Sequence, residues 1–300
     1  MINILNRAVT VGFFDGVHAG HRFLIRELKK HAAERNLKSC VITFRQHPRK
    51  VLQADFQPQL LSTPEEKFEY LLSTGVDEVI MLDFDLNMAN LTAREFIHHV
   101  LADRYQVKFL LAGHDHRFGR NREEGFDKYL EYGAECAMDV VKAERYTSSI
   151  FLHISSSEIR NALLMGEVKM AASLLTYPYS FEGIVVKGHQ IGRKIGFPTA
   201  NIQVINPDKL LPGSGVYAVK VNYLHKEFPG MMNIGVRPTL QEGNAKSYEV
   251  HIFDFTENIY NEQLKITFIE KIRDEKKFSD MDALTTQLTK DKNFTEQLFR

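Results

Sequence analysis

The stretch TVGFFDGVHAGHRFLIREL, residues 10–28, decides how the first part of this chain folds. An apolar strand-like run enters a glycine-rich turn, and an amphipathic helical pattern follows directly. Gly20 separates two histidines, His18 and His21, at the point where the expected strand gives way to the expected helix. In an open parallel sheet, ligands bind beyond the carboxyl ends of the strands, where helix N-termini present free N–H groups. This turn is therefore the first candidate for a ligand site.

Strand-like and helical segments alternate through the first part of the chain, over roughly 175 residues. Two of the helical segments begin with a capping-box pattern, Thr63 with Glu66 and Thr92 with Glu95. Short, nearly all-apolar strands between capped helices are typical of a parallel sheet covered on both faces. The strand-like runs are RAVTVGFF, SCVITF, VDEVIMLDF, VKFLLAG and CAMDVVKAE. We therefore expect an α/β domain.

The pattern changes near Tyr179, where short apolar segments broken by glycine, proline and asparagine begin. Several short strands with turn signals need closure to avoid exposed edges, so we expect a small antiparallel β-barrel. The amphipathic stretch MDALTTQLTKDKNFTEQL predicts a terminal helix. The strand-like segments are FEGIVVKG, GVYAVKVNYL, GMMNIGV, SYEVHIFDF and LKITFIEKI. The predicted domains are residues 1–179 and 180–300, an α/β plus β organisation.

The composition excludes several classes of protein. A length of 300 residues favours two domains. Lysine and arginine number 38, as do aspartate and glutamate, and this zero net charge argues against a nucleic acid or a membrane surface as partner. Two cysteines do not make a disulfide scaffold, and we find neither a secretory signal nor an apolar run of roughly 18 residues. We expect a cytoplasmic protein.

The residue types in the first turn suit phosphate chemistry. Gly12 and Gly16 allow a sharp turn, and Gly20 has no side chain to hold a phosphate away. Two imidazoles beside a helix N-terminus, His18 and His21, can donate hydrogen bonds to a phosphorus centre as charge develops, which stabilises nucleotidyl transfer. A pair of surface histidines on a first helical turn is the alternative. Zinc is a weaker one, because no third ligand follows at metal spacing.

A second phosphate-binding element is expected in the segment HISSSEIRNALLMGEV. Ser156 and Ser157 stand at a helix start and Arg160 follows one turn later, so hydroxyls, free N–H groups and a guanidinium converge. That set suits the outer phosphates of ATP. The alternative is a capping box of Ser155 with Glu158, which leaves the other serines and the arginine unexplained.

The segment LLAGHDHRFGR ends a predicted strand, so Asp115 and its neighbours would point into the same crevice. His114 and His116 could suggest a metal. Because alternate residues at a strand end face the same way by default, a substrate-contact loop is the favoured interpretation.

These motifs resemble the adenylyltransferase half of the prokaryotic bifunctional riboflavin kinase/FAD synthetase family. The resemblance rests on GFFDGVHAGH, GHDHRFG and ISSSEIR in this order and spacing, with TFRQHP after the second strand. It implies a Rossmann-like nucleotidyltransferase fold. It also implies that His18 and His21 stabilise phosphate, that Ser156 and Arg160 contact the ATP phosphates, and that Asp115 belongs to the flavin and adenylate pocket. The sequence has Phe13 where the family pattern has asparagine, His116 for phenylalanine and Ser157 for threonine.

A second site is expected in VVKGHQIGRKIGFPTANI, which lacks the order of a Walker A loop. Thr199 and Asn201 are two apart in an extended segment, so a hydroxyl and an amide oxygen face the same way, as hard ligands that Mg²⁺ accepts. A glycine-proline turn followed by a strand is the alternative. The residues that allow close approach of phosphates or supply charge are Gly188, Gly192, Arg193 and Gly196.

The segment SYEVHIFDF supplies a carboxylate. Strand alternation puts Glu249 and His251 on one face, opposite Tyr248 and Val250. A carboxylate directed at a phosphate and Mg²⁺ site could take the proton from an attacking hydroxyl. The alternative is an exposed glutamate on an edge strand.

The second half resembles the riboflavin kinase module of the same family across nearly all of residues 183–280. The matching segments are GRKIGFPTANI, GVYAV, MNIGVRPT, YEVHIFDF and KIRDEKKF. The resemblance implies ATP-dependent phosphorylation of the ribityl 5′-hydroxyl, with Glu249 as the base, Thr199 and Asn201 as Mg²⁺ ligands and Arg273 as a contact near the flavin.

We therefore expect a bifunctional enzyme whose substrates are small molecules. The barrel would make FMN from riboflavin and the first domain FAD from FMN, each with ATP and Mg²⁺, in a monomer or weak homo-oligomer. Two alternatives stay open. One is a riboflavin kinase whose first domain has lost adenylylation, motivated by Phe13 and His116. The other is a flavin-binding regulator without turnover.

Overall fold

A computed structural model describes residues 6–53, 55–114, 117–120, 123–147, 154–188, 191–238 and 244–300. The chain divides into two compact units, Met1–Ser156 and Ser157–Arg300. Helices α7 (Ser156–Leu164) and α8 (Val168–Leu175) precede the barrel, and all but the first residue of α7 belong to the second unit. The boundary predicted at residue 179 marks a change in amino-acid composition. The two units instead separate between Ser156 and Ser157, because they are defined by contacts within the chain.

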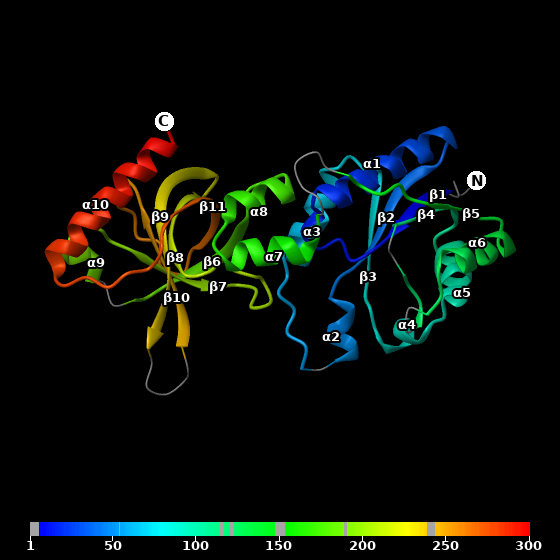
Figure 1. The fold of residues 1–300 in the computed structure, drawn as a ribbon, viewed down its shortest axis with the longest axis horizontal. Helices are drawn as coiled ribbons and strands as arrows, with labels where there is room; N and C mark the ends of the chain where they lie inside the picture. Colours follow the sequence, from blue (N-terminus) through cyan, green and yellow to red (C-terminus); the bar gives the residue numbers. More distant parts are fainter. Residues whose placement is uncertain are drawn as a thin grey trace. The chain divides into compact units, whose positions relative to one another are not determined.

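The first unit contains the parallel sheet that the sequence predicts (Figure 1). Its order is β3-β2-β1-β4-β5, and every neighbouring pair runs parallel. Val9 lies opposite both Cys40 and Leu110, so β1 is central. The strands are β1 (Arg7–Val11), β2 (Lys38–Phe44), β3 (Glu78–Leu82), β4 (Val107–Ala112) and β5 (Asp139–Lys142).

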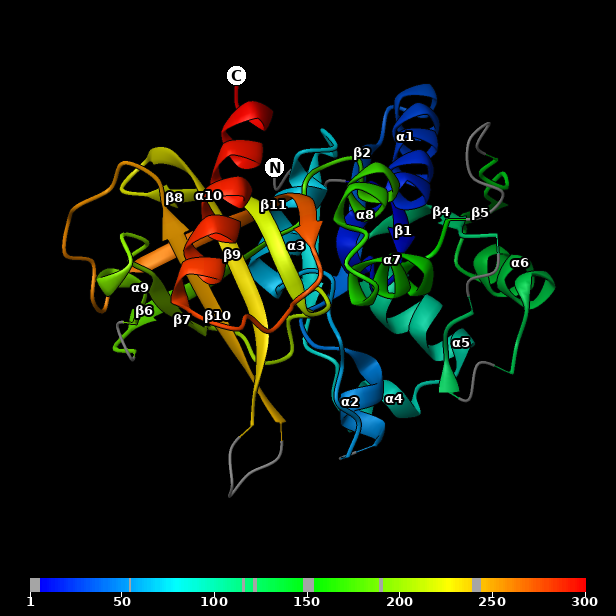
Figure 2. The same ribbon diagram turned by 60° about the vertical axis from the view of Figure 1, so that its left-hand side comes forward.

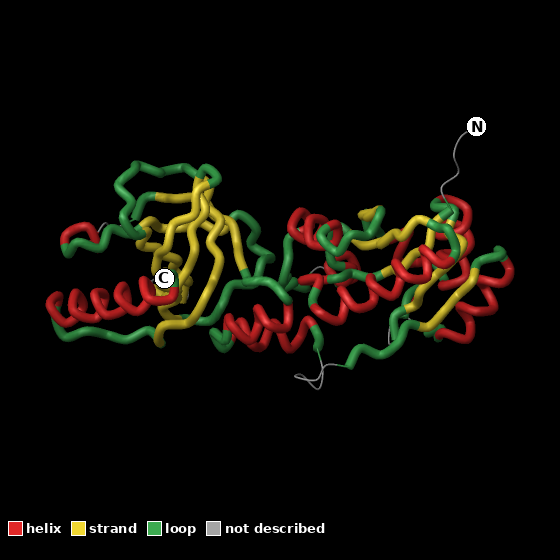
Figure 3. Tube along the Cα trace, turned by 90° about the horizontal axis from the view of Figure 1, so that it is seen from above, coloured by secondary structure: helices red, strands yellow, loops and turns green. Residues whose placement is uncertain are grey.

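Helices cover both faces of this sheet (Figure 3). Alternation along β1 puts Ala8 against α1 (Ala19–Glu34) and α3 (Pro64–Leu72), and Val9 against α6 (Phe126–Glu135) and a π-helix (Phe96–Arg104). Both predicted capping boxes are present, at Thr63 and Thr92. The short helices are a 3₁₀ turn (Asp15–Val17), α2 (Pro48–Leu52), α4 (Leu86–Asn90) and α5 (Ala93–Glu95).

The order of the strands defines where a ligand can bind. From β1 the chain goes to β2 and β3 on one side, and later to β4 and β5 on the other. The carboxyl ends of β1 and β4 therefore form the topological switch point, the usual place for a ligand in an open parallel sheet. The turn after β1 holds His18, and Gly113 follows β4.

The second unit is the predicted closed antiparallel barrel, ordered β10-β7-β6-β11-β8-β9. The rings of Phe181 and Tyr217 pack on Phe268 inside it, with centroids 5.8 and 5.3 Å away. The predicted terminal helix, α10 (Met281–Leu298), packs against β9 and β11 (Figure 2). The other elements are β6 (Ser180–Val186), α9 (Ile191–Lys194), β7 (Ala200–Val204), β8 (Gly215–Tyr223), β9 (Lys226–Pro238), β10 (Asn244–Ile252) and β11 (Gln263–Arg273).

The described part of the chain contains no helix that combines the length and the apolar character needed to cross a membrane.

Candidate active sites

The chain reverses direction in a tight turn after β1. Phe14 (φ 52°) and Gly16 (φ 76°) adopt left-handed conformations, which reverse the chain within a few residues. The buried Asp15 carboxylate accepts hydrogen bonds from the N–H groups of Leu61 and Ser62 at 2.9–3.1 Å. Because a buried carboxylate with several N–H donors is strongly held, this turn is fixed to the segment that precedes α3.

The two predicted histidines lie together at the start of α1. His18 is the N-cap, and its Nδ1 accepts a hydrogen bond from the His21 N–H at 3.4 Å. Their rings stack with centroids 3.7 Å apart. Because Nδ1 of His18 accepts this bond, the proton of the neutral ring is on Nε2. The pair therefore sits beside the N–H groups that begin α1, where anions are favoured.

The glycines of the turn make these contacts possible. A Cβ on Gly20 would lie 3.3 Å from the His18 ring, and one on Gly12 would lie 2.9 Å from the Phe14 ring. A side chain at either position would press on the turn that holds the histidines. Both glycines were predicted from the requirement for a sharp, open turn, and the structure adds the rings that they accommodate.

Ser156 approaches the same turn, because its hydroxyl donates to the Asp15 carbonyl at 3.1 Å. Ser157 and Arg160 follow on α7 within the second unit. Asp115, with His116, lies outside the described residues.

Lys67 is a component of this region that sequence reasoning missed. It is 1% exposed, and its Nζ donates to the Phe44 carbonyl at 2.6 Å. The Nζ also lies 3.8 Å from the centroid of the Phe13 ring, close enough for a cation–π interaction. Burial lowers the pKa of Lys67 to about 8, and the Asp15 carboxylate opposes that shift. Phe13, which departs from the family pattern, is thus a packed partner of a buried cation.

The segment after β4 is fastened at its far end. The Phe118 N–H donates to the Tyr129 hydroxyl at 3.0 Å, and the two rings stack at 4.2 Å. Gly119 (φ 87°) approaches Ala93 so closely that a Cβ would lie 2.5 Å from the Ala93 nitrogen. These contacts fix the described residues next to the predicted substrate loop.

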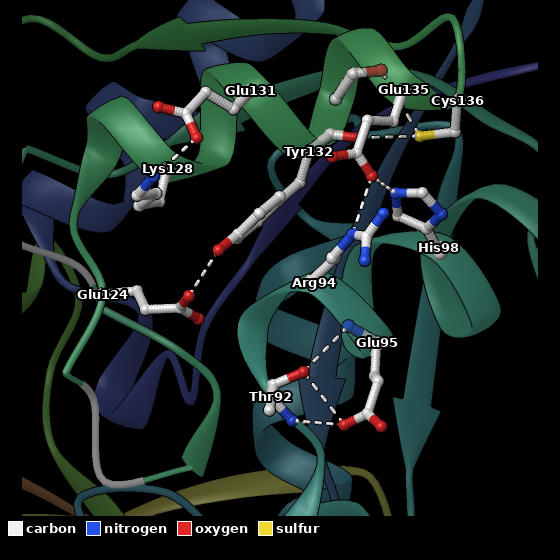
Figure 4. A network of polar contacts seen from close by, with 11 residues as sticks. Thr92, Arg94, Glu95, His98, Glu124, Lys128, Glu131, Tyr132, Glu135 and Cys136 are labelled. Atoms are coloured by element: carbon white, nitrogen blue, oxygen red, sulfur yellow. Dashed lines mark hydrogen bonds and ion pairs between the residues drawn. The ribbon is translucent and has the colours of Figure 1, made fainter.

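A polar network strengthens this attachment (Figure 4). The Glu124 carboxylate accepts from the Tyr132 hydroxyl at 2.5 Å and from the Ala93 N–H at 3.2 Å. On the same helix as Tyr132, Glu135 pairs with Arg94 at 2.7 Å and with His98 at 3.0 Å. The network therefore ties α6 to α5 and to the π-helix, and sequence spacing gave no sign of it.

The barrel brings together the residues predicted for the second site. Glu249 of β10 lies opposite Asn201 of β7, and Thr199 Oγ1 donates to Glu249 Oε2 at 3.4 Å. Gly188 lies directly against Asn201, because a Cβ there would collide with the Asn201 amide. A hydroxyl from the residue before β7, an amide from β7 and a carboxylate from β10 therefore lie together.

Two cavities meet at Thr199. The first, of about 320 Å³, contains Glu249 and is largely apolar; the residues that line it include Phe197, Thr199, Met231, Met232, His251, Arg273, Phe278 and Leu288. The second, of about 280 Å³, has the exposed Arg193 at its wall; its other lining residues include Val185, Pro198, Thr199, Thr256 and Asn258. Volumes of this size suit parts of a small ligand. Thr199 thus lines both cavities.

The loop between them is shaped by its glycines. A Cβ on Gly192 would collide with the Phe197 carbonyl, while the Gly192 carbonyl accepts from the N–H groups of Ile195 and Phe197. Gly196 has φ 81°, a conformation that favours glycine. The predicted glycine positions therefore serve a compact turn in which Gly192 lines the first cavity and Arg193 lines the second.

Arg273 lines the first cavity, but its guanidinium is directed at α10. Its Nη2 lies 2.8 Å from Asp291, whose side chain is 2% exposed, and Nε donates to the same carboxylate at 2.9 Å. Gln287 also donates to Asp291 at 2.7 Å. The arginine predicted as a flavin contact thus joins β11 to the terminal helix at the cavity wall.

Burial also sets the charge of two side chains on β10. It lowers the pKa of His251 and raises the pKa of Tyr248. Burial therefore favours the neutral form of each side chain.

The fold and these two sites define a two-domain transferase that works on phosphate groups. A family model described as "FAD synthetase" matches residues 3–158, and one described as "Riboflavin kinase" matches residues 175–299. The chain is 38% identical over 292 residues to the bifunctional riboflavin kinase/FMN adenylyltransferase of Escherichia coli (strain K12), covering 97% of this chain and 92% of that protein. It is 39% identical over 296 residues to the Haemophilus influenzae protein of the same description, covering 97% and 94%.

A solved structure described as "Crystal Structure of Macrolide-efflux Protein from Streptococcus pneumoniae" shares the fold, with a TM-score of 0.87 and 34% identity over 97% of this chain and 94% of that one. The chain belongs to the bifunctional riboflavin kinase/FMN adenylyltransferase family. Its N-terminal region is the FAD synthetase and its C-terminal region the riboflavin kinase, which confirms the activities predicted from the sequence. ATP and flavins are the substrates of this family.

Proposed function

We propose that Glu249 is the general base for phosphorylation of riboflavin in the barrel. The observation that carries this proposal is its contact with Thr199 at the junction of the two cavities. The apolar cavity suits a flavin, and the cavity beside Arg193 suits a nucleotide phosphate. The nucleophile is a neutral alcohol, so a carboxylate that accepts its proton as the phosphorus–oxygen bond forms accelerates the step.

Thr199 and Asn201 would hold Mg²⁺ in this site. Among the residues that the structure describes, no cluster of three or more His, Cys, Asp or Glu is placed to hold a metal. A hydroxyl and an amide oxygen beside one carboxylate fit Mg²⁺ instead, because this ion takes few protein ligands and completes its shell with waters and substrate phosphates. When bound, Mg²⁺ would neutralise charge on the ATP phosphates.

In the first unit, we propose that His18 and His21 stabilise the adenylyl transfer. An FMN phosphate oxygen would attack the α-phosphate of ATP, and pyrophosphate would leave. The nucleophile is already an anion and needs no base, so donors aimed at the developing charge are sufficient. The Nε2–H of His18 and the N–H groups of α1 provide such donors. Ser156, Ser157 and Arg160 remain predicted contacts to the ATP phosphates, and Asp115 a predicted flavin contact.

Phe13 does not by itself argue against this activity. Its ring is packed between Lys67 and His47, 3.8 Å from the Lys67 Nζ and 4.7 Å from the His47 ring centroid. The ring of Phe13 therefore has packing partners on both of these side chains. A kinase with an impaired first domain is the second candidate, and it predicts FMN as the final product.

We also propose that the enzyme acts in the cytoplasm on small molecules alone, as a monomer or weak homo-oligomer. Cys40 and Cys136 are both free thiols, as a reducing compartment allows. The zero net charge gives no support for a nucleic-acid partner.

The experiment is a chromatographic assay of flavin products with ATP and Mg²⁺, started separately from riboflavin and from FMN. We expect FAD in both reactions, with FMN appearing first from riboflavin. FMN that never becomes FAD would select the monofunctional kinase. Flavin binding without ATP consumption would select the regulator.

A further inference from the structure

His251 is a buried side chain next to the second site that the proposed chemistry does not use. It stands two residues after Glu249 on β10 and is 8% exposed. The rings of Phe197 and Phe253 flank it, with centroids 5.3 and 5.5 Å from the imidazole. Its Nδ1 lies 2.7 Å from the Pro198 carbonyl oxygen. Because a carbonyl oxygen can only accept, Nδ1 carries the proton and donates to Pro198.

The hydrogen bond from His251 to Pro198 lies just beyond the last backbone pair between β10 and β7. The pairing of β10 with β7 runs through Glu249 opposite Asn201 and Val250 opposite Ala200, and β7 begins at Ala200. Pro198 comes before the strand and has no N–H to offer a neighbour. The side chain of His251 therefore extends the connection between β10 and the incoming chain by two residues.

Thr199 is held between these two connections. On one side it leads into β7, and on the other it follows Pro198, which His251 fixes. Its Oγ1 donates to Glu249 Oε2 at 3.4 Å, so the position of this hydroxyl relative to the carboxylate depends on both. Loss of the His251 hydrogen bond would free one end of the segment that carries Thr199.

We propose that His251 is a positioning residue for riboflavin phosphorylation, whose Nδ1–H holds the Pro198 carbonyl and thereby sets the Thr199 hydroxyl against Glu249. This inference rests on the proposed function of the barrel. Side chains that orient a ligand or a base in this way typically contribute 10- to 100-fold to activity.

Two substitutions separate the hydrogen bond from packing. Asparagine in His251→Asn can place its amide N–H close to the position of Nδ1, but it fills less of the space between the aromatic rings. Leucine in His251→Leu fills that space and cannot donate. A role in packing alone would make the asparagine variant the worse of the two, whereas a positioning role makes the leucine variant worse.

The measurement is steady-state formation of FMN from riboflavin, with formation of FAD from supplied FMN by the same preparation as the control. For His251→Leu we expect kcat for FMN to fall about 10- to 100-fold, with the KM for riboflavin changed less than about threefold. His251→Asn should stay within about threefold of the wild type in kcat. Both variants should form FAD at the wild-type rate.

A spectroscopic readout does not depend on turnover. In the ¹⁵N–¹H spectrum of the imidazoles, assigned by comparison with His251→Asn, His251 should show a protonated Nδ1 and an unprotonated Nε2. Three results would each overturn the role of His251 and leave the proposed function of the barrel intact. They are an Nε2–H tautomer of His251, an unchanged kcat in His251→Leu, and equal losses of kcat in the two variants. A wild-type enzyme that makes no FMN would contradict the proposed function, and the inference would fall with it.

Discussion

The two candidate sites are built in different ways. In the first unit, the backbone places the functional groups: a left-handed turn delivers His18 to the N-cap of α1, and His21 stacks on it. In the barrel, side chains do this work: Glu249 of β10 lies opposite Asn201 of β7, and Thr199, which immediately precedes β7, donates to Glu249.

This difference follows the chemistry of the two nucleophiles. An FMN phosphate is already charged, so N–H groups and imidazoles that stabilise the developing charge can carry the reaction. The riboflavin hydroxyl is neutral and benefits from a base, which a strand can hold in place. A helix N-terminus provides donors, whereas a ladder provides a positioned carboxylate. We therefore expect FAD formation to be lost when a hydrogen-bond donor is removed from the first site. We expect FMN formation to be lost when the carboxylate is removed from the barrel.

The largest expected effect is the loss of the base. Glu249→Gln keeps the shape of the side chain but cannot accept the proton, so FMN formation should fall about 1,000-fold. FAD formation from supplied FMN should stay within about twofold. Rates of both reactions, followed by chromatography of the flavins, provide the measurement.

Glu182→Gln is the matched control, because Glu182 is an exposed strand glutamate outside the residues that line the two cavities. It should leave both rates unchanged. If Glu249→Gln formed FMN as fast as Glu182→Gln does, the assignment of the base would be wrong.

A smaller loss is expected when one donor is removed from the first site. His21→Ala should lower FAD formation from FMN about 100-fold, since a single preorganised donor contributes effects of this order. FMN formation from riboflavin should not change. The exposed His99 offers a control, and His99→Ala should leave both reactions intact. Equal damage to FMN and FAD formation by His21→Ala in folded protein would break the comparison between the sites.

The remaining effect is on stability and its dependence on pH, not on turnover. The pKa of Lys67 is about 8 in the folded protein against 10.5 as its ordinary value. Between these values the unfolded chain binds more protons than the folded one, so stability rises as pH increases from about 8 to 10.5. At about 1.4 kcal/mol for each unit of pKa, the gain approaches about 3 kcal/mol.

Urea unfolding followed by circular dichroism at several pH values tests this, with Lys67→Met as the reference. The stability of the wild type relative to Lys67→Met should increase from pH 7 to pH 10. A difference that stays constant over this range would show that the ammonium is not buried as the structure has it.

Much of the fold could be predicted from the sequence because its signals are local. Capping boxes, short apolar strands and glycine-rich turns each report on a few neighbouring residues, and they indicated the parallel sheet and the barrel. The histidine pair and the Thr199–Glu249 pair could be predicted because a turn or a strand fixes which way each side chain faces.

What could not be predicted depends on contacts distant in sequence. A lysine in a capped helix is expected at the surface, yet Lys67 is buried against Phe13 and the Phe44 carbonyl. The sequence likewise gave no sign that Arg273, the predicted flavin contact, pairs with Asp291 of α10. A hint for Lys67 was present in its spacing, because it stands four residues before the buried Leu71 on the same helical face.

The central claim is that one chain carries two independent sites. The most direct test mixes the Glu249→Gln and His21→Ala variants and follows flavins from riboflavin with ATP and Mg²⁺. Neither variant alone should convert riboflavin to FAD at an appreciable rate, whereas the mixture should form FMN and then FAD. A mixture that forms no FAD, although each variant retains its own single reaction in folded protein, would contradict the account.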